Sequence, residues 1–226
     1  MRCYLAVFIF ASIHLFAAAE TLRYNVNWPS GLSLGEATLS VDNLDASAVS
    51  RRFEMRLDAS VPGYGVADEI TALASSAYCS TQLDKKLKHG ARNTNERLEF
   101  KASEGILERT TVQTQKPGVS KVPIGPCARD ALTMVYFLRS ELKLGRVPAA
   151  QTVYFGAAYQ LSFKYLGAAP VSLGSGTEQA DRMQIQIKGP ASLNTLEVFF
   201  GRDPLRTPLL FRVPLLLGTF AMELQR

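Results

Sequence analysis

Histidine and cysteine are scarce in this sequence, and their scarcity limits the chemistry that it can support. The 226 residues include two histidines and three cysteines, and His14 and Cys3 lie in the first 14 positions. Beyond these, His89 stands without a G-x-S-x-G motif, so neither a Ser-His-Asp nor a Cys-His catalytic set is evident. Zinc sites built from histidine and cysteine lack ligands in the same way. We expect no enzymatic activity, no metal and no cofactor, although carboxylates such as Asp68-Glu69 or Asp203 keep acid–base chemistry open in principle.

The sequence has one pronounced apolar stretch at its start, and that stretch is short. Met1-Arg2 is followed by the mostly apolar residues 5–16 and by Ala17-Ala18-Ala19, which offers a small-residue cleavage site before Glu20. This order is typical of a secretory signal peptide. The run is shorter than the roughly 20 residues that span a bilayer, so a retained anchor is the weaker alternative. We predict a signal peptide over residues 1–19 and a single β-rich domain over residues 20–226, with no transmembrane segment after cleavage.

Long blocks of one charge are also missing. Removal of 19 residues leaves 207, and the formal charge falls from +5 to +4 because only Arg2 is lost. The densest basic piece, Lys85–His89, has two interpretations: a patch for acidic lipid head groups or polyanions, or a solvated turn. We predict the turn, because charge runs this short usually lie in solvent. No motif of interleaved basic and aromatic residues is present, so we expect no nucleic-acid partner.

Two cysteines, Cys79 and Cys127, remain after the leader is removed together with Cys3. In an oxidising compartment such a pair is typical of one disulfide bond. A redox pair or a pair of metal ligands fits less well, because no C-x-x-C motif and no histidine cluster accompanies them. We therefore predict a structural disulfide between Cys79 and Cys127.

Alternation of apolar and polar residues dominates the rest of the chain. Apolar residues recur at every second position in five segments: 24–28, 53–59, 153–165, 183–187 and 196–200. A period of two is typical of half-buried antiparallel strands. Breaks such as Pro62-Gly63 and Gly189-Pro190 separate these segments. We predict a mainly β fold of about ten antiparallel strands, in one curved sheet or an open barrel.

Residues 130–144 depart from this pattern and predict a helix. Asp130 suits the N-cap position, Gly145 suits the C-terminal stop, and Pro148 follows. The apolar residues of this helix occupy most of its sides, which is typical of a helix that is buried on most sides. We therefore expect one buried helix, inside the sheet or across its concave face.

Aromatic residues on the alternating strands are candidates for the wall of an apolar cavity, although each alone is more often ordinary core. Arg139 in the predicted helix and Arg206 in a proline-bordered turn would need partners if buried. Asp130 or Asp203 could pair with them and lock the helix to the sheet, which we favour; the alternative is a ligand carboxylate or phosphate. The candidate ligand-binding residues are Trp28, Tyr136, Arg139, Arg206 and Phe211.

Prolines recur near the C-terminus, at Pro204, Pro208 and Pro214. We predict a turn between two strands there, with the prolines at edge or bulge positions.

Three separated motifs resemble the domain of unknown function 3108 of exported bacterial proteins. They are Y-x-V-x-W-x-x-G-L-x-x-G-x-A-x-L at residues 24–39, D-x-L-T-x-x-Y-x-x-R at residues 130–139 and D-P-x-R-x-P at residues 203–208. They stand in the family's order and bracket nearly the whole mature chain. The resemblance implies a β-rich periplasmic or envelope-associated fold with one central helix, and it brings no established activity. The cysteine pair is a feature of only part of such a family, so the disulfide rests on the oxidising compartment.

These observations favour a periplasmic or secreted module that binds or carries a lipid or another amphiphile. The alternative is a structural or assembly factor that binds another envelope protein through a sheet edge or an apolar patch. A third option is an outer-membrane barrel, which the charged alternating faces and the apolar helix disfavour. Association with the outer membrane stays open for either of the first two.

Overall fold

The computed structural model describes residues 19–226 except for 44–48, 62, 113–117, 175 and 216–217. Apart from Ala19, the predicted signal peptide lies outside the described residues. No helix in the described part of the chain has the length and apolarity that a membrane crossing requires.

The alternating segments form strands, as predicted. The first half of the chain contributes β1 (Glu20–Asn27), β2 (Ser33–Val41), β3 (Ser50–Val61), β4 (Tyr64–Ser75), β5 (Ser80–His89), β6 (Arg92–Lys101), the 3-10 turn η1 (Ala102–Glu104), β7 (Ile106–Thr111) and β8 (Gly118–Pro123). The second half contributes β9 (Arg129–Asp130), α1 (Ala131–Lys143), β10 (Gln151–Tyr154), β11 (Ala158–Leu173), β12 (Gly176–Lys188), β13 (Leu193–Gly201), β14 (Pro208–Leu215) and β15 (Gly218–Leu224).

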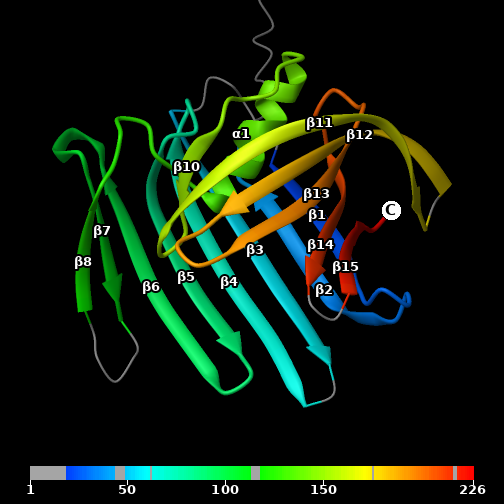
Figure 1. The fold of residues 1–226 in the computed structure, drawn as a ribbon, viewed down its shortest axis with the longest axis horizontal. Coiled ribbons are helices and arrows are strands. Elements are labelled where there is room, and N and C mark those ends of the chain that lie inside the picture. Colours follow the sequence, from blue (N-terminus) through cyan, green and yellow to red (C-terminus); the bar gives the residue numbers. More distant parts are fainter. Residues whose placement is uncertain (1–18, 44–48, 62, 113–117, 175, 216–217) are drawn as a thin grey trace, which may run out of the picture.

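All fifteen strands belong to one sheet (Figure 1). Strands β1 to β8 pair in sequence order, β9 to β15 do the same, and β1 joins the two halves by pairing with β15. The pairs are antiparallel except for β9 with β10. The sheet curls so that the start of β5 meets the residue before β9: the Ser80 N–H donates to the Ala128 carbonyl at 2.9 Å. In the described chain the end strands β8 and β9 do not pair with each other, so the curled sheet stays open.

The expected class is confirmed, but the count of about ten strands is too low. One cause is the segment that alternates from Val153 to Tyr165, which reads as a single strand in the sequence. The structure divides it into β10 and β11 by a tight turn, in which the Phe155 N–H donates to the Ala157 carbonyl at 3.0 Å. Because the turn has three residues, the apolar residues of β10 and β11 that share a face both fall on odd positions, and the alternation in the sequence continues across the turn.

Helix α1 begins and ends where its sequence predicts. The Asp130 carboxylate accepts from the Leu132 and Thr133 N–H groups at 2.8 and 2.9 Å, which is N-cap geometry. After the helix, Gly145 adopts a left-handed φ of 68°, and its N–H donates to the Leu142 carbonyl. Figure 1 shows α1 at one end of the curled sheet.

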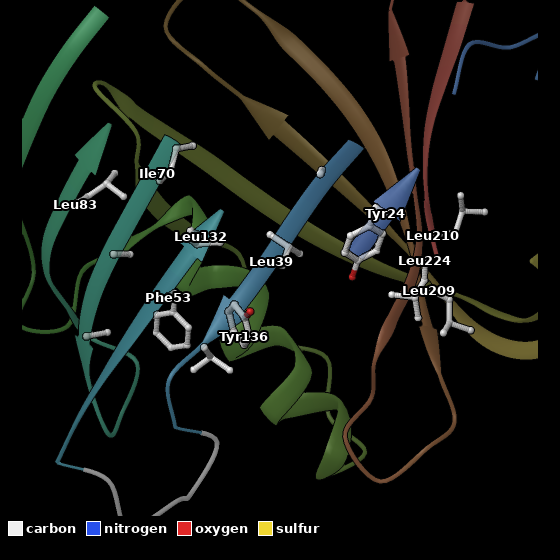
Figure 2. Close-up of a cluster of buried hydrophobic side chains, with 14 of the residues drawn as sticks. Tyr24, Leu39, Phe53, Ile70, Leu83, Leu132, Tyr136, Leu209, Leu210 and Leu224 are labelled. Atoms are coloured by element: carbon white, nitrogen blue, oxygen red, sulfur yellow. The ribbon is translucent and has the colours of Figure 1, made fainter. Parts of the chain in front are cut away.

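The helix packs between two hydrophobic clusters, one on each of its sides. Leu132 and Tyr136 join the larger cluster, which draws on strands of both halves of the sheet and includes Tyr24 and Phe53 (Figure 2). The Tyr136 and Phe53 rings lie 4.4 Å apart between centroids. The other side of α1 packs against the second half of the sheet in a cluster with Phe200. Burial on both sides is the arrangement that the nearly all-round apolar helix predicts.

The solvated turn that we predicted at Lys85–His89 is wrong. These residues lie in β5, and the side chain of Lys85 is only 4% exposed. Lys85 shares the inner face of the sheet with Leu83 and Leu87, because alternate residues of a strand point to the same side. The short charge run therefore mixes one buried lysine with the exposed Lys86 and Lys88.

The turn expected around Pro204 lies between β13 and β14, and Pro208 begins β14 at an irregularity in the pairing register. The bulge position is thus confirmed. An edge position is not, because β14 pairs with both β13 and β15. Pro214 pairs with Thr219 of β15. It lies two positions beyond Arg212, where the pairing of β14 with β13 ends at Glu197.

Candidate functional site: an apolar cavity beside the helix

An apolar cavity of about 370 Å³ lies between α1 and strands β10 to β14. Helix α1 supplies one wall through residues spaced by three and four positions, which share one face of a helix. These residues are Ala131, Met134, Val135 and Leu138.

The second half of the sheet supplies the opposite wall. Its lining residues come from one face, and cross-strand pairing holds them in rows: Phe163, Ile185 and Leu196 form one row, and Leu161, Ile187 and Asn194 form the next. The other lining residues of the sheet half are Val153, Phe155, Tyr159, Val198, Phe200 and Phe211. The alternation that predicts the strands thus also builds this wall.

Among the residues that the structure describes, the lining carries no charged side chain, and its polar side-chain groups are the Tyr159 hydroxyl and the Asn194 amide. Leu138, Val153 and Phe200 are buried, whereas Tyr159 and Ile187 are half-buried and Asn194 is exposed. A space with largely apolar walls and these two polar groups can hold an apolar chain.

Only one of the five candidate ligand-binding residues, Phe211, lines this cavity. Tyr136 faces the opposite side of α1, where it packs on Phe53; burial raises the pKa of its phenol well above the ordinary value. Trp28 lies edge-on to Phe220, with ring centroids 4.8 Å apart. The structure therefore brings Phe211 to the cavity and places Tyr136 and Trp28 elsewhere.

Both candidate arginines make ion pairs within the protein, but not with the acids that we expected. Arg139 donates to both carboxylate oxygens of Glu20 at 2.6 and 2.8 Å and to the Leu205 carbonyl at 3.2 Å. Arg206 donates to Asp181 at 2.6 Å.

The acids named as their partners are engaged elsewhere. Asp130 caps α1 and accepts from the Ser80 and Thr133 hydroxyls at 2.6 Å each. Asp203 accepts from the Thr207 hydroxyl and from N–H groups within its own turn. Because all these contacts tie elements of the fold together, they support the structural interpretation of the two arginines.

A buried ionic cluster that the sequence interpretation missed adjoins the cavity. Lys85 Nζ lies 2.9 Å from Glu96 Oε2, and Glu96 also accepts from Arg109. Lys85 Nζ donates to the Phe155 carbonyl at 3.2 Å and lies 4.2 Å from the centroid of the Phe155 ring. We call Lys85, Glu96 and Arg109 the inner ionic cluster. Because Phe155 lines the cavity, one side chain separates the cavity from this cluster.

Burial and its neighbours shift the titration of the inner ionic cluster. Burial alone would raise the pKa of Glu96, but hydrogen bonds from Arg109 and Lys85 and their charges lower it overall. Burial lowers the pKa of Lys85, against the hydrogen bond and charge of Glu96. The sequence does contain a sign of this cluster. Lys85 is two positions from Leu83 and Leu87, and Glu96 is two positions from Leu98, so each charged residue shares a strand face with apolar residues.

The remaining carboxylate candidates do not form an acid pair. Asp68 and Glu69 are neighbours in β4 and point to opposite faces of the sheet. Asp68 contacts His89 at 2.9 Å, whereas Glu69 lies 3.7 Å from Lys86.

The disulfide between Cys79 and Cys127 is present. It joins the residue before β5 to the loop before β9, beside the contact between Ser80 and Ala128. The disulfide thus fastens the start of β5 covalently to the segment that leads into α1.

Comparison with solved structures supports the fold. A structure from Brucella abortus, described as a beta-barrel-like protein of the domain of unknown function DUF1849, is similar with a TM-score of 0.63 and 9% identity, over 93% of this chain and 96% of that chain. A putative exported protein from Bacteroides fragilis with a YmcC-like fold aligns over 91% of this chain and 93% of that chain at 8% identity, with a TM-score of 0.31. No curated protein matches the chain.

The family model described as a protein of unknown function, DUF3108, matches residues 23–225, which agrees with the three motifs and with the β-rich fold around one helix. The chain therefore belongs to the DUF3108 family.

Proposed function

We propose that this protein is a non-catalytic module that binds or carries a lipid-like amphiphile in the envelope. The observation that carries the proposal is the cavity of about 370 Å³ between α1 and β10 to β14, whose described lining residues include no charged side chain. Ligand pockets are commonly about 300–1,000 Å³ and mostly apolar. Each methylene group that leaves water for such a space contributes roughly 0.8 kcal/mol, so an acyl chain would be held by its apolar part alone.

The cavity walls suggest a direct test with a small neutral dye. N-phenyl-1-naphthylamine fluoresces in apolar surroundings, and its binding to the purified mature protein should be saturable. Val135 is half-buried on α1 and lines the cavity, so Val135→Phe should fill part of the space and weaken binding about tenfold. Val119 on β8 is 62% exposed, and Val119→Phe is the matched control that should bind as the wild type does. Equal binding by both variants would contradict the proposed site.

A second test uses protein purified from the envelope without detergent. Native mass spectrometry should detect a co-purifying amphiphile in the wild type and less of it in Val135→Phe. N-terminal sequencing of the same material tests the proposed export, since cleavage after Ala19 gives Glu20 as the first residue. An uncleaved chain recovered from the cytoplasm would contradict that part of the proposal.

The alternative is an assembly factor, and one feature of the sheet favours it. Among the described strands β8 pairs only with β7, so its other edge is free, and Val119 and Lys121 on it are exposed. A free edge can accept a strand from another protein. Crosslinking in cells from a photoreactive residue at Val119 should then capture one dedicated partner, whereas a carrier should give diffuse products.

A further inference from the structure

The inner ionic cluster lies directly under the turn that bounds the cavity. Gly156 follows Phe155 with a φ of 90°, and a Cβ atom there would stand 3.0 Å from Lys85 Nζ, 3.1 Å from Glu96 Oε2 and 4.0 Å from Arg109 Nε. The backbone of the turn therefore touches the cluster through a position that only glycine fits. Phe155 itself has its ring against Lys85 and also lines the cavity.

The charges of this cluster do not balance. Two cations share one carboxylate, and the Lys85 and Glu96 side chains are 4% and 5% exposed. Outside the cluster, the direct cross-strand partners of its three residues are uncharged: Ile70, Leu98, Thr111 and Ser120. Burial makes uncompensated charge costly, so an additional anion would stabilise the cluster.

Arg109 is the member of the cluster that a solute can reach. Its side chain is 35% exposed, although its Nε is buried and has no hydrogen-bond partner among the described residues. A planar guanidinium suits a carboxylate or a phosphate, because it offers several donors in one plane.

We propose that the cavity takes a single-chain amphiphile with an anionic head group, and that Arg109, under the turn of Phe155 and Gly156, receives this head group. The inference rests on the proposed function, because the uncharged cavity holds only the tail. A volume of about 370 Å³ is near the lower end of ligand pockets and suits one chain rather than two. Carboxylate and phosphate heads share the required charge, and the test separates them.

The test is displacement of bound N-phenyl-1-naphthylamine from the full mature protein by dodecanoic acid, dodecyl phosphate and 1-dodecanol below their aggregation limits. The three share one chain and differ in the head. At least one of the anionic compounds should displace the dye at about tenfold lower concentration than dodecanol, which corresponds to about 1.4 kcal/mol. The acid and the phosphate arms then tell which head is preferred.

The variant Arg109→Gln should remove this preference and leave displacement by dodecanol unchanged. Arg97→Gln is the matched control, because Arg97 lies on the next strand, faces the other side of the sheet and pairs with Asp84 at 2.7 Å. Lys85→Met should also lower the preference, and thermal unfolding reports whether that variant folds.

The outcomes are distinct. Equal displacement by acid, phosphate and alcohol, or a preference that survives Arg109→Gln, overturns the head-group site while the cavity stands. If the dye does not bind at all, the proposed function itself fails.

Discussion

Arg139 of α1 and Glu20 of β1 form a two-point ion pair at 2.6 and 2.8 Å across 119 positions of the sequence. Their side chains are 4% and 10% exposed. Removal of one partner from a buried pair leaves a charge without compensation, whereas removal of both can cost much less. The pair therefore fixes α1 to the first strand that follows the predicted cleavage site.

We expect Arg139→Met to lower the free energy of unfolding by roughly 3–5 kcal/mol, and the double variant Arg139→Met/Glu20→Gln to lower it by less. Urea denaturation of the three proteins measures both values. Arg146→Gln is the control: Arg146 pairs with Glu141 at the surface, where its side chain is 59% exposed, so its loss should be much smaller than that of Arg139→Met. Similar losses for Arg139 and Arg146 would mean that the buried pair does not anchor α1.

The disulfide predicts a second stability effect. Reduction, or the double variant Cys79→Ala/Cys127→Ala, opens a loop with a sequence separation of 48 and should lower the free energy of unfolding by roughly 2–4 kcal/mol. Thermal unfolding with and without dithiothreitol measures it. The double variant serves as the control, since dithiothreitol should not change its melting temperature. If the wild type melts at the same temperature under both conditions, the bond does not contribute to stability.

The sequence predicts α1 well because each of its signals is local. Asp130 caps the helix, Gly145 ends it, and the apolar residues on most of its sides predict that the helix is buried. The strands are predicted for the same reason, since alternation needs only neighbours in the chain. The turn at Phe155 is not predicted, because apolar residues continue at odd positions across it. The position of the cavity wall, which depends on this turn, is therefore not predicted either.

The cavity depends on contacts that no local pattern contains. Whether Val135 and Leu196 touch or leave a space between them depends on how far the sheet curls around α1, which is a property of the whole sheet. Tyr136 and Arg139 of the helix motif face away from the cavity, since Leu132, Tyr136 and Arg139 share one side of the helix and Met134 and Leu138 the other. The motif thus marks the contact between helix and sheet.

Gly156 gives a third prediction. Gly156→Ala places a methyl group 3.0 Å from Lys85 Nζ at a backbone φ of 90°, so both strain and contact oppose it. We expect a loss of roughly 1–3 kcal/mol in unfolding free energy. The turn should also open, which faster hydrogen exchange at the Phe155 N–H would report.

The control for this change is Gly125→Ala, since Gly125 has no atom within 4 Å of its Cβ position and no positive φ. This variant should be close to the wild type in both measurements. A stable Gly156→Ala protein with unchanged exchange would show that the turn does not rest on the inner ionic cluster.

The inner ionic cluster also predicts how stability depends on pH. Its neighbours hold the pKa of Glu96 below its ordinary value, so the native state binds this proton less readily than the unfolded state does. The resulting stabilisation is fully present above about pH 4.5 and is lost as the pH falls through the lower native value. Asp130 acts in the opposite sense, because burial raises its pKa above 3.8 and its stabilising contribution grows on acidification.

A comparison with Glu96→Gln separates these two effects, because Asp130 is the same in both proteins. Urea denaturation between pH 7 and pH 3 should show the wild type losing more stability than Glu96→Gln over the acidic part of the range, while Glu96→Gln is less stable at pH 7 because Lys85 and Arg109 lose their counter-charge. Glu69→Gln, at a side chain that is 60% exposed, should follow the wild type. Parallel pH profiles for the wild type and Glu96→Gln would mean that Glu96 has the same proton affinity folded and unfolded, and that Lys85 and Arg109 do not act on it as their contacts imply.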